Sequence, residues 1–349
     1  MEPTEIPTVV LNTGQRMPMI AFGTGMLPLN SLKSQQQTRK GKNRGNKPGR
    51  QLAAVTTVQQ RRRLANRLRR SAIPALNASL SLGYNHLDMS EVYPDFAEAG
   101  KLIRPHRHRL WVTSKVDPTI AHEGIACVAD GGGCDAAMRS AANSTVSRLG
   151  FAPDLLLLHR PPKRMGSDAA QCKRLQGLWR GMEQAQRGGL AKAIGLSNVC
   201  GPLLHCLSLS LSIKPAVVQY MHHVGMGNDP LGYRSWTRRV WGSAYMAYSV
   251  LGGAEQDFGQ IVTAPAVAAA ARAHSTHAAN IALSWVAQQE MPLVIISSKP
   301  SHMKENLNVF TRPRWGKLSA AEMQALSELK KPAGRPAYWG DCRDAAPSG

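Results

Sequence analysis

Short apolar runs and segments of helical pattern alternate along the chain. Eight apolar runs are expected to form strands: Ile20–Gly23, His86–Asp88, Leu110–Ser114, Asp154–His159, Ala193–Ser197, Ala216–Tyr220, Ala244–Tyr248 and Leu293–Ser297. Helical patterns occupy Ser71–Leu82, a stretch starting near Phe96, Ala136–Leu149, Leu178–Arg187, Tyr233–Trp241, Pro265–Ala273, His277–Gln289 and Lys317–Lys331. This alternation favours an α/β fold, the closed (β/α)8 TIM barrel. A doubly wound open sheet is the alternative, and the lack of GxGxxG after the first strand disfavours its dinucleotide-binding form.

A hairpin precedes this alternation, two segments interrupt it, and a tail follows it. Pro7–Met19 is expected to form a β-hairpin, with Asn12-Thr13-Gly14 as its turn. After the first barrel strand, residues 28–70 form a basic insertion that is expected to be disordered over Ser31–Arg50, where almost nothing is apolar. Val55–Arg70 is compatible with a short basic helix. Ile120–Ala136 is expected to be a long loop, and 332–349 an irregular tail. Residues 1–349 are therefore interpreted as one barrel domain.

The charge of the chain lies mostly in that insertion. Formal net charge is +21, no Asp or Glu occurs between Glu5 and Asp88, and thirteen Lys and Arg residues lie between Lys33 and Arg70. A solvated loop explains this segment most simply. Binding to nucleic acid or another anionic surface, or nuclear targeting, are the alternatives. The lack of interleaved aromatic residues weakens the case for stacking on single strands.

Other bulk features indicate where the protein acts. No apolar run approaches the roughly 20 residues of a membrane helix, and the N-terminus does not resemble a secretory signal, so a cytoplasmic protein without a membrane span is expected. The six cysteines are scattered without a CxxC pair. Reduced thiols and no metal site are the expectation.

Polar residues at three predicted strand ends carry the candidate chemistry. Asp88, Lys115 and His159 end or follow strands, and Tyr93 lies on the loop after the first of these. Barrel enzymes work at the carboxyl ends of their strands, so these four side chains are expected to meet. Taken singly, Tyr93, Lys115 and His159 each have a purely structural interpretation: a loop tyrosine, a surface lysine and a hydrogen-bonded histidine at a strand end.

The four groups suit reduction of a carbonyl by a hydride donor. Tyr93 can give a proton to the carbonyl oxygen as a general acid, and the ammonium of Lys115 would lower the phenol pKa from about 10. Asp88 would pair with Lys115 and hold it in place. His159 would donate a hydrogen bond that orients the carbonyl.

Seven motifs in register resemble the aldo-keto reductase family. They cover about nine-tenths of the chain: GYxHxDxSxxY at Gly83–Tyr93, TSK at Thr113–Lys115, DLLLLH at Asp154–His159, GLSN at Gly195–Asn198, VVQ at Val217–Gln219, AYSxLG at Ala247–Gly252 and SSxPxHxxEN at Ser297–Asn306. The resemblance implies the same tetrad, a hairpin that plugs the bottom of the barrel, and NADPH as cofactor, with NADH possible.

The resemblance also implies which residues bind the cofactor. They are Gly23, Thr24 and Asp88 near the first strands, Ser197, Asn198, Gln219 and Tyr248 at the nicotinamide, Ser249, Leu251 and Gly252 along the pyrophosphate, and Ser297, Ser298, Lys299, His302, Glu305 and Asn306 at the adenosine end. The alternatives are helix caps for Ser197 and Asn198, a core role for Tyr248, and ordinary helix residues for Glu305 and Asn306.

The chain departs from the family pattern at several of these positions. Ile296 stands where a Lys or Arg commonly binds the 2′-phosphate, and His302 where Arg is frequent; Lys299 can compensate. Arg160 follows His159 where an aromatic residue is usual, which predicts a more polar substrate mouth. Met89 and Val250 also differ from the family pattern, and none of these changes removes a tetrad group.

The sequence therefore predicts a monomeric oxidoreductase that reduces aldehydes or ketones to alcohols with NADPH and no metal. Two other functions remain open. One is a regulatory barrel that binds nucleotide but turns over slowly or not at all. The other is a binder of nucleic acid or an anionic surface through Lys33–Arg70.

Overall fold

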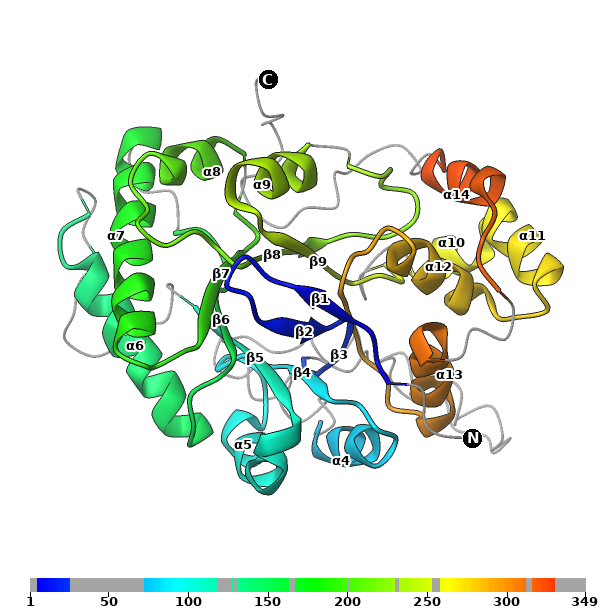
Figure 1. Cartoon of the computed structure of the whole chain (residues 1–349), viewed down its shortest axis with the longest axis horizontal. Helices are drawn as coiled ribbons and strands as arrows, with labels where there is room; N and C mark the ends of the chain where they lie inside the picture. Colours follow the sequence, from blue (N-terminus) through cyan, green and yellow to red (C-terminus); the bar gives the residue numbers. More distant parts are fainter. Residues whose placement is uncertain are drawn as a thin grey trace, which may run out of the picture.

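The computed structural model describes residues 5–25, 72–117, 127, 131–162, 167–199, 201–229, 232–252, 258–311 and 316–329. Eight parallel strands in these ranges close into a barrel in the order β10-β3-β4-β5-β6-β7-β8-β9. They are β3 (Ile20–Gly23), β4 (His86–Asp88), β5 (Trp111–Val116), β6 (Leu155–Leu158), β7 (Ala193–Ser197), β8 (Val217–Met221), β9 (Ala244–Tyr248) and β10 (Leu293–Ile295). The predicted (β/α)8 barrel is confirmed, and Figure 1 looks along it.

Helices surround this barrel on its outside (Figure 1). They are α4 (Ile73–Ser81), α5 (Phe96–Ile103), the 3-10 helix η2 (Arg104–Arg109), α6 (Cys134–Leu149), α7 (Asp168–Arg187), α8 (Gly201–Ser208), α9 (Tyr233–Trp241), α10 (Phe258–Thr263), α11 (Pro265–Ala273), α12 (Ala278–Ala287), α13 (Pro300–Thr311) and α14 (Ala320–Ser327). Helices α6 and α7 approach closely because α7 carries Gly181: a β-carbon there would lie 2.5 Å from the carbonyl oxygen of Asp135.

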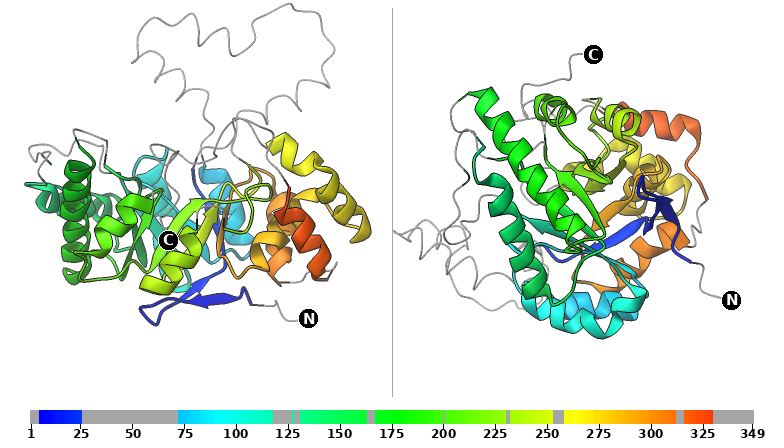
Figure 2. Two further views of the ribbon diagram at one scale, coloured as in Figure 1. Left: turned by 90° about the horizontal axis from the view of Figure 1, so that it is seen from above. Right: turned by 60° about the vertical axis from the view of Figure 1, so that its left-hand side comes forward.

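A β-hairpin closes the amino-terminal end of the barrel, as predicted. Strands β1 (Thr8–Val10) and β2 (Arg16–Pro18) pair antiparallel, and the left view of Figure 2 shows them beneath the barrel. Leu11 and Met17 are buried against the apolar side chains inside the barrel. The side-chain amide of Asn12 donates to the carbonyl oxygens of Pro215, at 2.9 Å, and Trp241, at 3.0 Å. The opposite end is left for a functional site.

Several element ends differ from the sequence prediction. Helix α7 begins at Asp168 rather than Leu178, because the Ser167 side chain accepts a hydrogen bond from the Ala170 amide and caps the helix. Helix α14 begins at Ala320, after a capping box between Ser319 and Glu322, rather than at Lys317. Helix α6 already starts at Cys134, inside the predicted loop Ile120–Ala136.

Strand β10 is shorter than predicted and ends at Ile295. Ser297, which the sequence predicts to end the strand, is instead part of the turn that leads into α13: its hydroxyl oxygen accepts from the Lys299 amide at 3.1 Å. The basic insertion 28–70, most of the predicted loop before α6 and the tail 332–349 lie outside the described residues.

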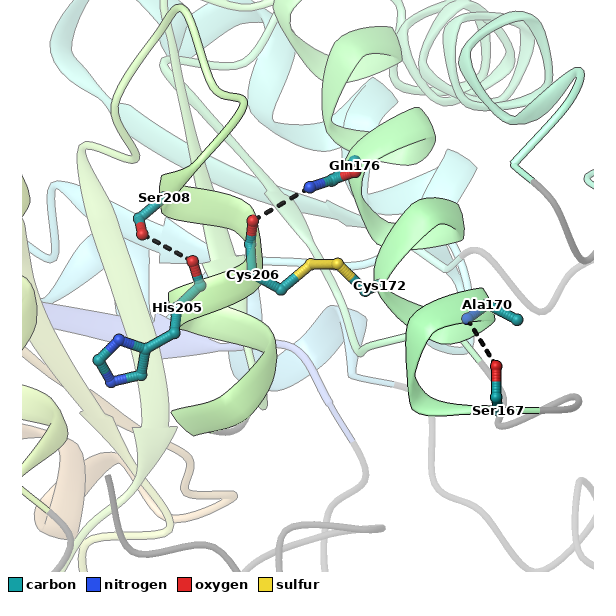
Figure 3. Close-up of a disulfide and its surroundings, with 7 residues drawn as sticks. All are labelled: Ser167, Ala170, Cys172, Gln176, His205, Cys206 and Ser208. Atoms are coloured by element: carbon teal, nitrogen blue, oxygen red, sulfur yellow. Dashed lines mark hydrogen bonds between the residues drawn. A yellow bond between two sulfur atoms is a disulfide. The ribbon is translucent and has the colours of Figure 1, made fainter. Parts of the chain in front are cut away.

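The expectation of reduced thiols is wrong for four of the cysteines. Cys172 of α7 is bonded to Cys206 of α8, as Figure 3 shows, and Cys127 is bonded to Cys134 at the start of α6. The sequence could not reveal the first pair, because 34 positions separate its partners and the helical packing brings them together.

Candidate active site

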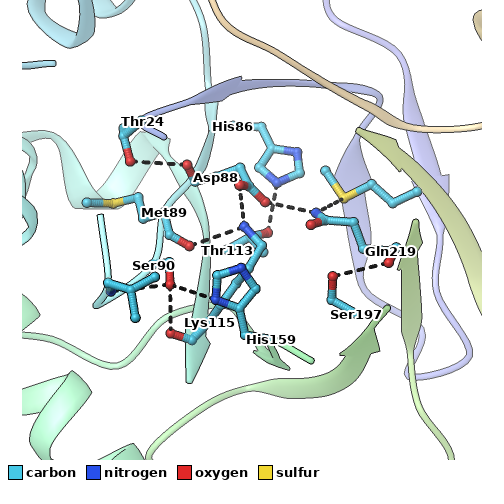
Figure 4. A network of polar contacts seen from close by, with 12 residues as sticks. Thr24, His86, Asp88, Met89, Ser90, Thr113, Lys115, His159, Ser197 and Gln219 are labelled. Atoms are coloured by element: carbon cyan, nitrogen blue, oxygen red, sulfur yellow. Dashed lines mark hydrogen bonds and ion pairs between the residues drawn. The ribbon is translucent and has the colours of Figure 1, made fainter. Parts of the chain in front are cut away.

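Four polar side chains converge at the carboxyl end of the barrel. Asp88 is the last residue of β4, Lys115 lies near the end of β5, and His159 directly follows β6. Tyr93 lies on the loop between β4 and α5. Because neighbouring parallel strands end at the same rim, these residues meet there, and Figure 4 shows the side chains of Asp88, Lys115 and His159 close together.

Lys115 lies at the centre of this group and is almost completely buried. Its Nζ forms an ion pair with Oδ1 of Asp88 and donates to the carbonyl oxygen of Met89 at 3.3 Å. The same nitrogen lies 5.3 Å from the centre of the Tyr93 ring. Burial lowers the pKa of Lys115, but the charge of Asp88 and the contact with Tyr93 outweigh it, so the pKa lies above its ordinary value. Lys115 is therefore an ammonium group.

Tyr93 holds its proton more tightly than a free phenol does. Burial raises the pKa of Tyr93, and the nearby charge of Lys115 lowers it without reversing the net rise. The expectation that Lys115 brings this pKa below its ordinary value is therefore wrong for the net direction, although Lys115 acts in the predicted sense. The physical reason is that removal from water destabilises the Tyr93 phenolate more than the nearby ammonium of Lys115 stabilises it. Tyr93 is protonated at neutral pH.

His159 faces Tyr93 edge to face. The two ring centres are 5.9 Å apart, with an angle of 84° between the planes. Burial and then the charges of Lys115 and Arg160 lower the pKa of His159 to about 2, so its ring is neutral. Nδ1 lies 3.2 Å from the hydroxyl of Ser90, and the side-chain amide of Asn198 donates to the His159 carbonyl oxygen at 2.9 Å.

Both carboxylate oxygens of Asp88 have partners. Lys115 pairs with Oδ1, and the side-chain amide of Gln219 donates to Oδ2 at 2.9 Å. Gln219 therefore supports the ion pair directly, a contact that the sequence did not predict. Ser197 donates to the carbonyl oxygen of Gln219 at 3.1 Å, and the hydroxyl of Thr24 donates to that of Asp88 at 3.3 Å.

The residues predicted to bind the nicotinamide continue around the same rim. Tyr248, at the end of β9, donates from its hydroxyl to Oδ1 of Asn198 at 2.6 Å. Asn198 also donates to Ser197 at 3.0 Å. Asn198 and Ser249 adopt left-handed backbone conformations, with φ of 61° and 51°. Leu251 and Gly252 follow on this loop and are partly buried.

The residues predicted to bind adenosine lie one strand further, after β10. Because β10 pairs with both β3 and β9, this group lies between the ends of those strands, next to Gly23 and Thr24. Ser298, Lys299 and His302 are exposed around the start of α13. Glu305 is 3.8 Å from His277, whereas Asn306 is buried. Strand β3 separates β10 from β4 in the barrel, so a ligand that reached both this group and Asp88 would be elongated.

Sequence reasoning missed the support beneath the tetrad. Glu91 is buried; its carboxylate accepts from the Asp117 amide at 3.1 Å and from the Thr145 hydroxyl at 2.9 Å. Ser90 lies in the quoted motif, but spacing alone does not show that its hydroxyl reaches His159.

Chemically, the rim offers a protonated phenol, a neutral imidazole and a buried ammonium–carboxylate pair. This set can hold a carbonyl oxygen and protonate it. Among the described residues, no group of three or more His, Cys, Asp or Glu side chains could hold a metal ion. In the same ranges, no helix is long and apolar enough to cross a membrane.

Comparison with known proteins gives one consistent family. The model of the aldo/keto reductase family matches residues 57–331. Aldo-keto reductase family 1 member A1 of Rattus norvegicus is 27% identical over 349 residues, covering 93% of this chain and 89% of the relative. The (1S)-1,7-diacetoxy-luvungin A aldo-keto reductase of Citrus sinensis is 27% identical over 272 residues, or 72% of this chain and 79% of the relative.

Solved structures agree on the fold. An aldo-keto reductase from a Medee basin deep-sea metagenome, MGS-M4, matches with a TM-score of 0.67 at 22% identity, covering 96% of this chain and 99% of that one. The aldose reductase of Schistosoma japonicum matches with a TM-score of 0.64 at 24% identity, covering 95% and 94%.

Proposed function

The chain belongs to the aldo/keto reductase family, and from this premise we propose that it reduces aldehydes or ketones to alcohols with NADPH as the reductant. Membership of this family supports oxidoreductase activity of the chain toward such carbonyl compounds. The observation that carries the finer proposal is the convergence of Asp88, Tyr93, Lys115 and His159 on one rim of the barrel.

Tyr93 is the proposed proton donor. Its raised pKa keeps the proton on the phenol before the reaction, as an acid requires. As negative charge builds on the carbonyl oxygen, the Tyr93 proton moves to that oxygen, and the ammonium of Lys115 stabilises the phenolate left behind. Asp88 and Gln219 hold Lys115 in position. A neutral His159 can donate a hydrogen bond to the same carbonyl oxygen and orient it.

The polar strand ends fit an extended dinucleotide. Asn198 and Ser197 present amide and hydroxyl groups beside the tetrad, and the Tyr248 ring lies at the end of β9, where it can stack on a flat heterocycle. When bound, NADPH supplies the hydride. The proposed contacts of Gly23, Thr24, Gln219, Ser249, Leu251 and Gly252 follow from the family resemblance.

The adenosine end supports NADPH over NADH through charge. Lys299 and His302 are exposed at the start of α13, where a helix amino terminus attracts phosphate. Ile296 contributes no charge there, so Lys299 is the proposed partner of the 2′-phosphate. Ser297, Ser298, Glu305 and Asn306 complete this proposed subsite.

The test is oxidation of NADPH, followed by absorbance, with a panel of simple aldehydes and ketones. Turnover with NADPH that exceeds turnover with NADH supports the proposal. Lys299→Ala is expected to raise KM for NADPH and to leave KM for NADH nearly unchanged. Binding of cofactor without turnover of any carbonyl compound would instead favour the regulatory barrel.

The basic insertion carries a second, independent proposal. Its thirteen Lys and Arg residues suit nucleic acid or another anionic surface. Binding that weakens steeply with salt, and that disappears when 28–70 are deleted, supports this function. Binding that survives the deletion would contradict it.

We also propose that the protein is monomeric and cytoplasmic. The redox state of Cys172 and Cys206 tests this compartment, because disulfides are uncommon in the cytosol. Free thiols at these positions in protein isolated from its own cells would support the cytoplasm, and an intact disulfide would point to an oxidising compartment.

A further inference from the structure

The amino-terminal end of the barrel, opposite the tetrad, carries exposed cations beside exposed apolar side chains. We call this set the basal face; it consists of Val10, Arg16, Leu209, Lys214, Arg238 and Arg239. We propose that the basal face binds a membrane surface rich in anionic lipid, with its cations at the headgroup phosphates and its apolar side chains inserted between the headgroups. This binding does not depend on the proposed reductase chemistry, which uses the other end of the barrel.

The topology brings three separate segments to this end. Val10 and Arg16 are paired across the hairpin strands β1 and β2, which lie beneath the barrel in the left view of Figure 2. Leu209 and Lys214 lie on the loop between α8 and β8, and the two arginines form the end of α9, just before β9. Residues that directly precede parallel barrel strands lie at the amino-terminal end of the barrel, so all three segments share that end.

The hairpin turn holds these segments next to one another. The side-chain amide of Asn12 donates to the carbonyl oxygen of Pro215, at 2.9 Å, and to that of Trp241, at 3.0 Å. Pro215 directly follows Lys214, and Trp241 follows Arg239 by two positions. The basal face is therefore one surface rather than three scattered sites.

Two apolar side chains project from this surface. Val10 is 57% exposed and Leu209 is 85% exposed, and among the described residues these are the two large apolar side chains that are exposed. A single exposed apolar residue is ordinary, but here both accompany cations at one end of the molecule. Peripheral membrane binding combines burial of apolar side chains with attraction to anionic lipid. Aliphatic side chains cannot stack on bases, which favours lipid over single-stranded nucleic acid.

The four cations of the basal face have no ion-pair partner in the part of the chain that the structure describes. The segments that carry the face, 8–18, 208–216 and 235–243, contain no Asp or Glu. Their charge is therefore available to an anionic partner. A Lys or Arg close to an anionic leaflet strengthens binding by about fivefold.

Acidic groups at the same end oppose this charge only weakly. Glu183 lies beneath the loop that carries Leu209, but its carboxylate is buried and accepts from the Ser212 amide at 2.7 Å. Glu5 and Glu290 are exposed, yet both lie outside the three segments.

Docking through the basal face leaves the active site open to water, because the tetrad lies at the carboxyl end of the strands. The basic insertion also belongs to that other end. Gly25, the last described residue before it, has its α-carbon beside the Tyr93 ring, since a β-carbon there would lie 3.5 Å from the ring. Binding through the insertion and binding through the basal face can therefore be separated by substitution.

The test is co-sedimentation of the full chain with vesicles of phosphatidylcholine and phosphatidylserine, beside vesicles of phosphatidylcholine alone. We expect binding to the anionic vesicles that weakens with salt. The triple variant Lys214→Gln, Arg238→Gln, Arg239→Gln should bind about a hundredfold more weakly, at about fivefold for each cation. Leu209→Ser should weaken binding by about three- to tenfold through lost apolar burial.

The matched control is the triple variant Arg139→Gln, Lys173→Gln, Lys304→Gln. These three exposed cations lie in the first two turns of α6, α7 and α13, near the carboxyl end of the barrel. The control loses the same total charge and should bind the anionic vesicles nearly as the wild type does. Every substitution is at an exposed position, and thermal unfolding midpoints check that the fold is kept.

Three results would overturn the proposal. One is an equal loss in the two triple variants, which would show that net charge alone attracts the vesicles. Another is unchanged binding by the basal-face variant, which would leave the insertion 28–70 as the binding segment. The third is binding to an RNA oligonucleotide that falls in the basal-face variant, without binding to vesicles, which would assign the face to nucleic acid.

Discussion

A single ring proton decides what His159 can do. Because the ring is neutral, only one nitrogen carries hydrogen. The Ser90 hydroxyl lies 3.2 Å from Nδ1 and 3.4 Å from the carbonyl oxygen of Lys115, and it can donate to one of them. If Ser90 donates to Nδ1, the proton is on Nε2, which can then donate to a carbonyl substrate. The shorter contact favours this arrangement.

Ser90→Ala should therefore lower kcat. We expect a loss of about five- to tenfold, the value of one neutral hydrogen bond, with Ser90→Thr retaining more activity because it keeps a hydroxyl. Nitrogen NMR of His159 should show the proton moving away from Nε2 in the alanine variant. An unchanged kcat with an unchanged tautomer would contradict this role.

Sequence reasoning found the reacting residues but not their supports. Asp88, Lys115 and His159 could be located because each ends or follows an apolar strand. The contact between Ser90 and His159 spans 69 positions, and that between Gln219 and Asp88 spans 131. Such contacts depend on the strand order of the closed barrel, which spacing along the chain does not encode.

At the scale of elements, β7 and β8 approach so closely that position 195 of β7 has room only for glycine. A β-carbon on Gly195 would lie 2.3 Å from the carbonyl oxygen of Val217 in β8. Strand β7 carries Ser197 and leads to Asn198, so the spacing between β7 and β8 also positions these two residues at the carboxyl end of the barrel.

Gly195→Ala should destabilise the protein by about 1–3 kcal/mol through overpacking. Gly188→Ala is the control, because φ is −80° there and the nearest atom would lie 3.2 Å from the added carbon. Denaturant unfolding measures both. A Gly195→Ala midpoint at or above that of the control would contradict the steric account.

The Cys172–Cys206 bond joins α7 to α8, which follows the strand bearing Ser197 (Figure 3). Replacing both cysteines with serine should destabilise the fold by about 2–4 kcal/mol, as expected for a closed loop of this length. Thermal unfolding with and without reductant measures the effect, and alkylation before and after reduction checks the pairing. Identical unfolding under both conditions would contradict it.

At the scale of the whole molecule, the buried His86 and His222 and the half-buried His159 couple stability to pH. Burial is the largest cause in each case, and it lowers the pKa of His86 to about 4, of His159 to about 2 and of His222 to about 3. The unfolded chain takes up these protons near pH 6.5, before the folded chain does. The contribution of these histidines to the free energy of unfolding is therefore fully present above about pH 6.5 and decreases as the pH falls below that value.

His222→Phe should reduce this dependence. Within the described ranges neither ring nitrogen of His222 has a hydrogen-bond partner, and the ring stacks on Trp285 with 5.4 Å between centres. Phenylalanine keeps the stacking and removes the titrating group. Free energies of unfolding measured between about pH 5 and pH 8 should show a flatter profile for the variant. A profile parallel to that of the wild type would contradict the assignment.

The overall architecture could be predicted from the sequence, because the alternation of strands and helices follows from the local pattern of apolar and polar residues. The long insertion did not obscure it, since Phe22 and Gly23 of β3 still pair with Leu87 and Asp88 of β4 across the intervening residues. Helix starts were less readable because caps such as Ser167 and Ser319 extend or delay a helix beyond its apolar pattern. The pairing of Cys172 with Cys206 could not be predicted from the sequence, because only the packing of α7 against α8 makes them neighbours.

The most direct test of the account is kcat for carbonyl reduction by Tyr93→Phe, measured beside NADPH affinity. The account predicts that kcat falls by about 10²–10⁴-fold, the contribution of a positioned general acid, while NADPH still binds. Reduction at close to the wild-type rate in Tyr93→Phe would show that another group supplies the proton, and would contradict the central claim.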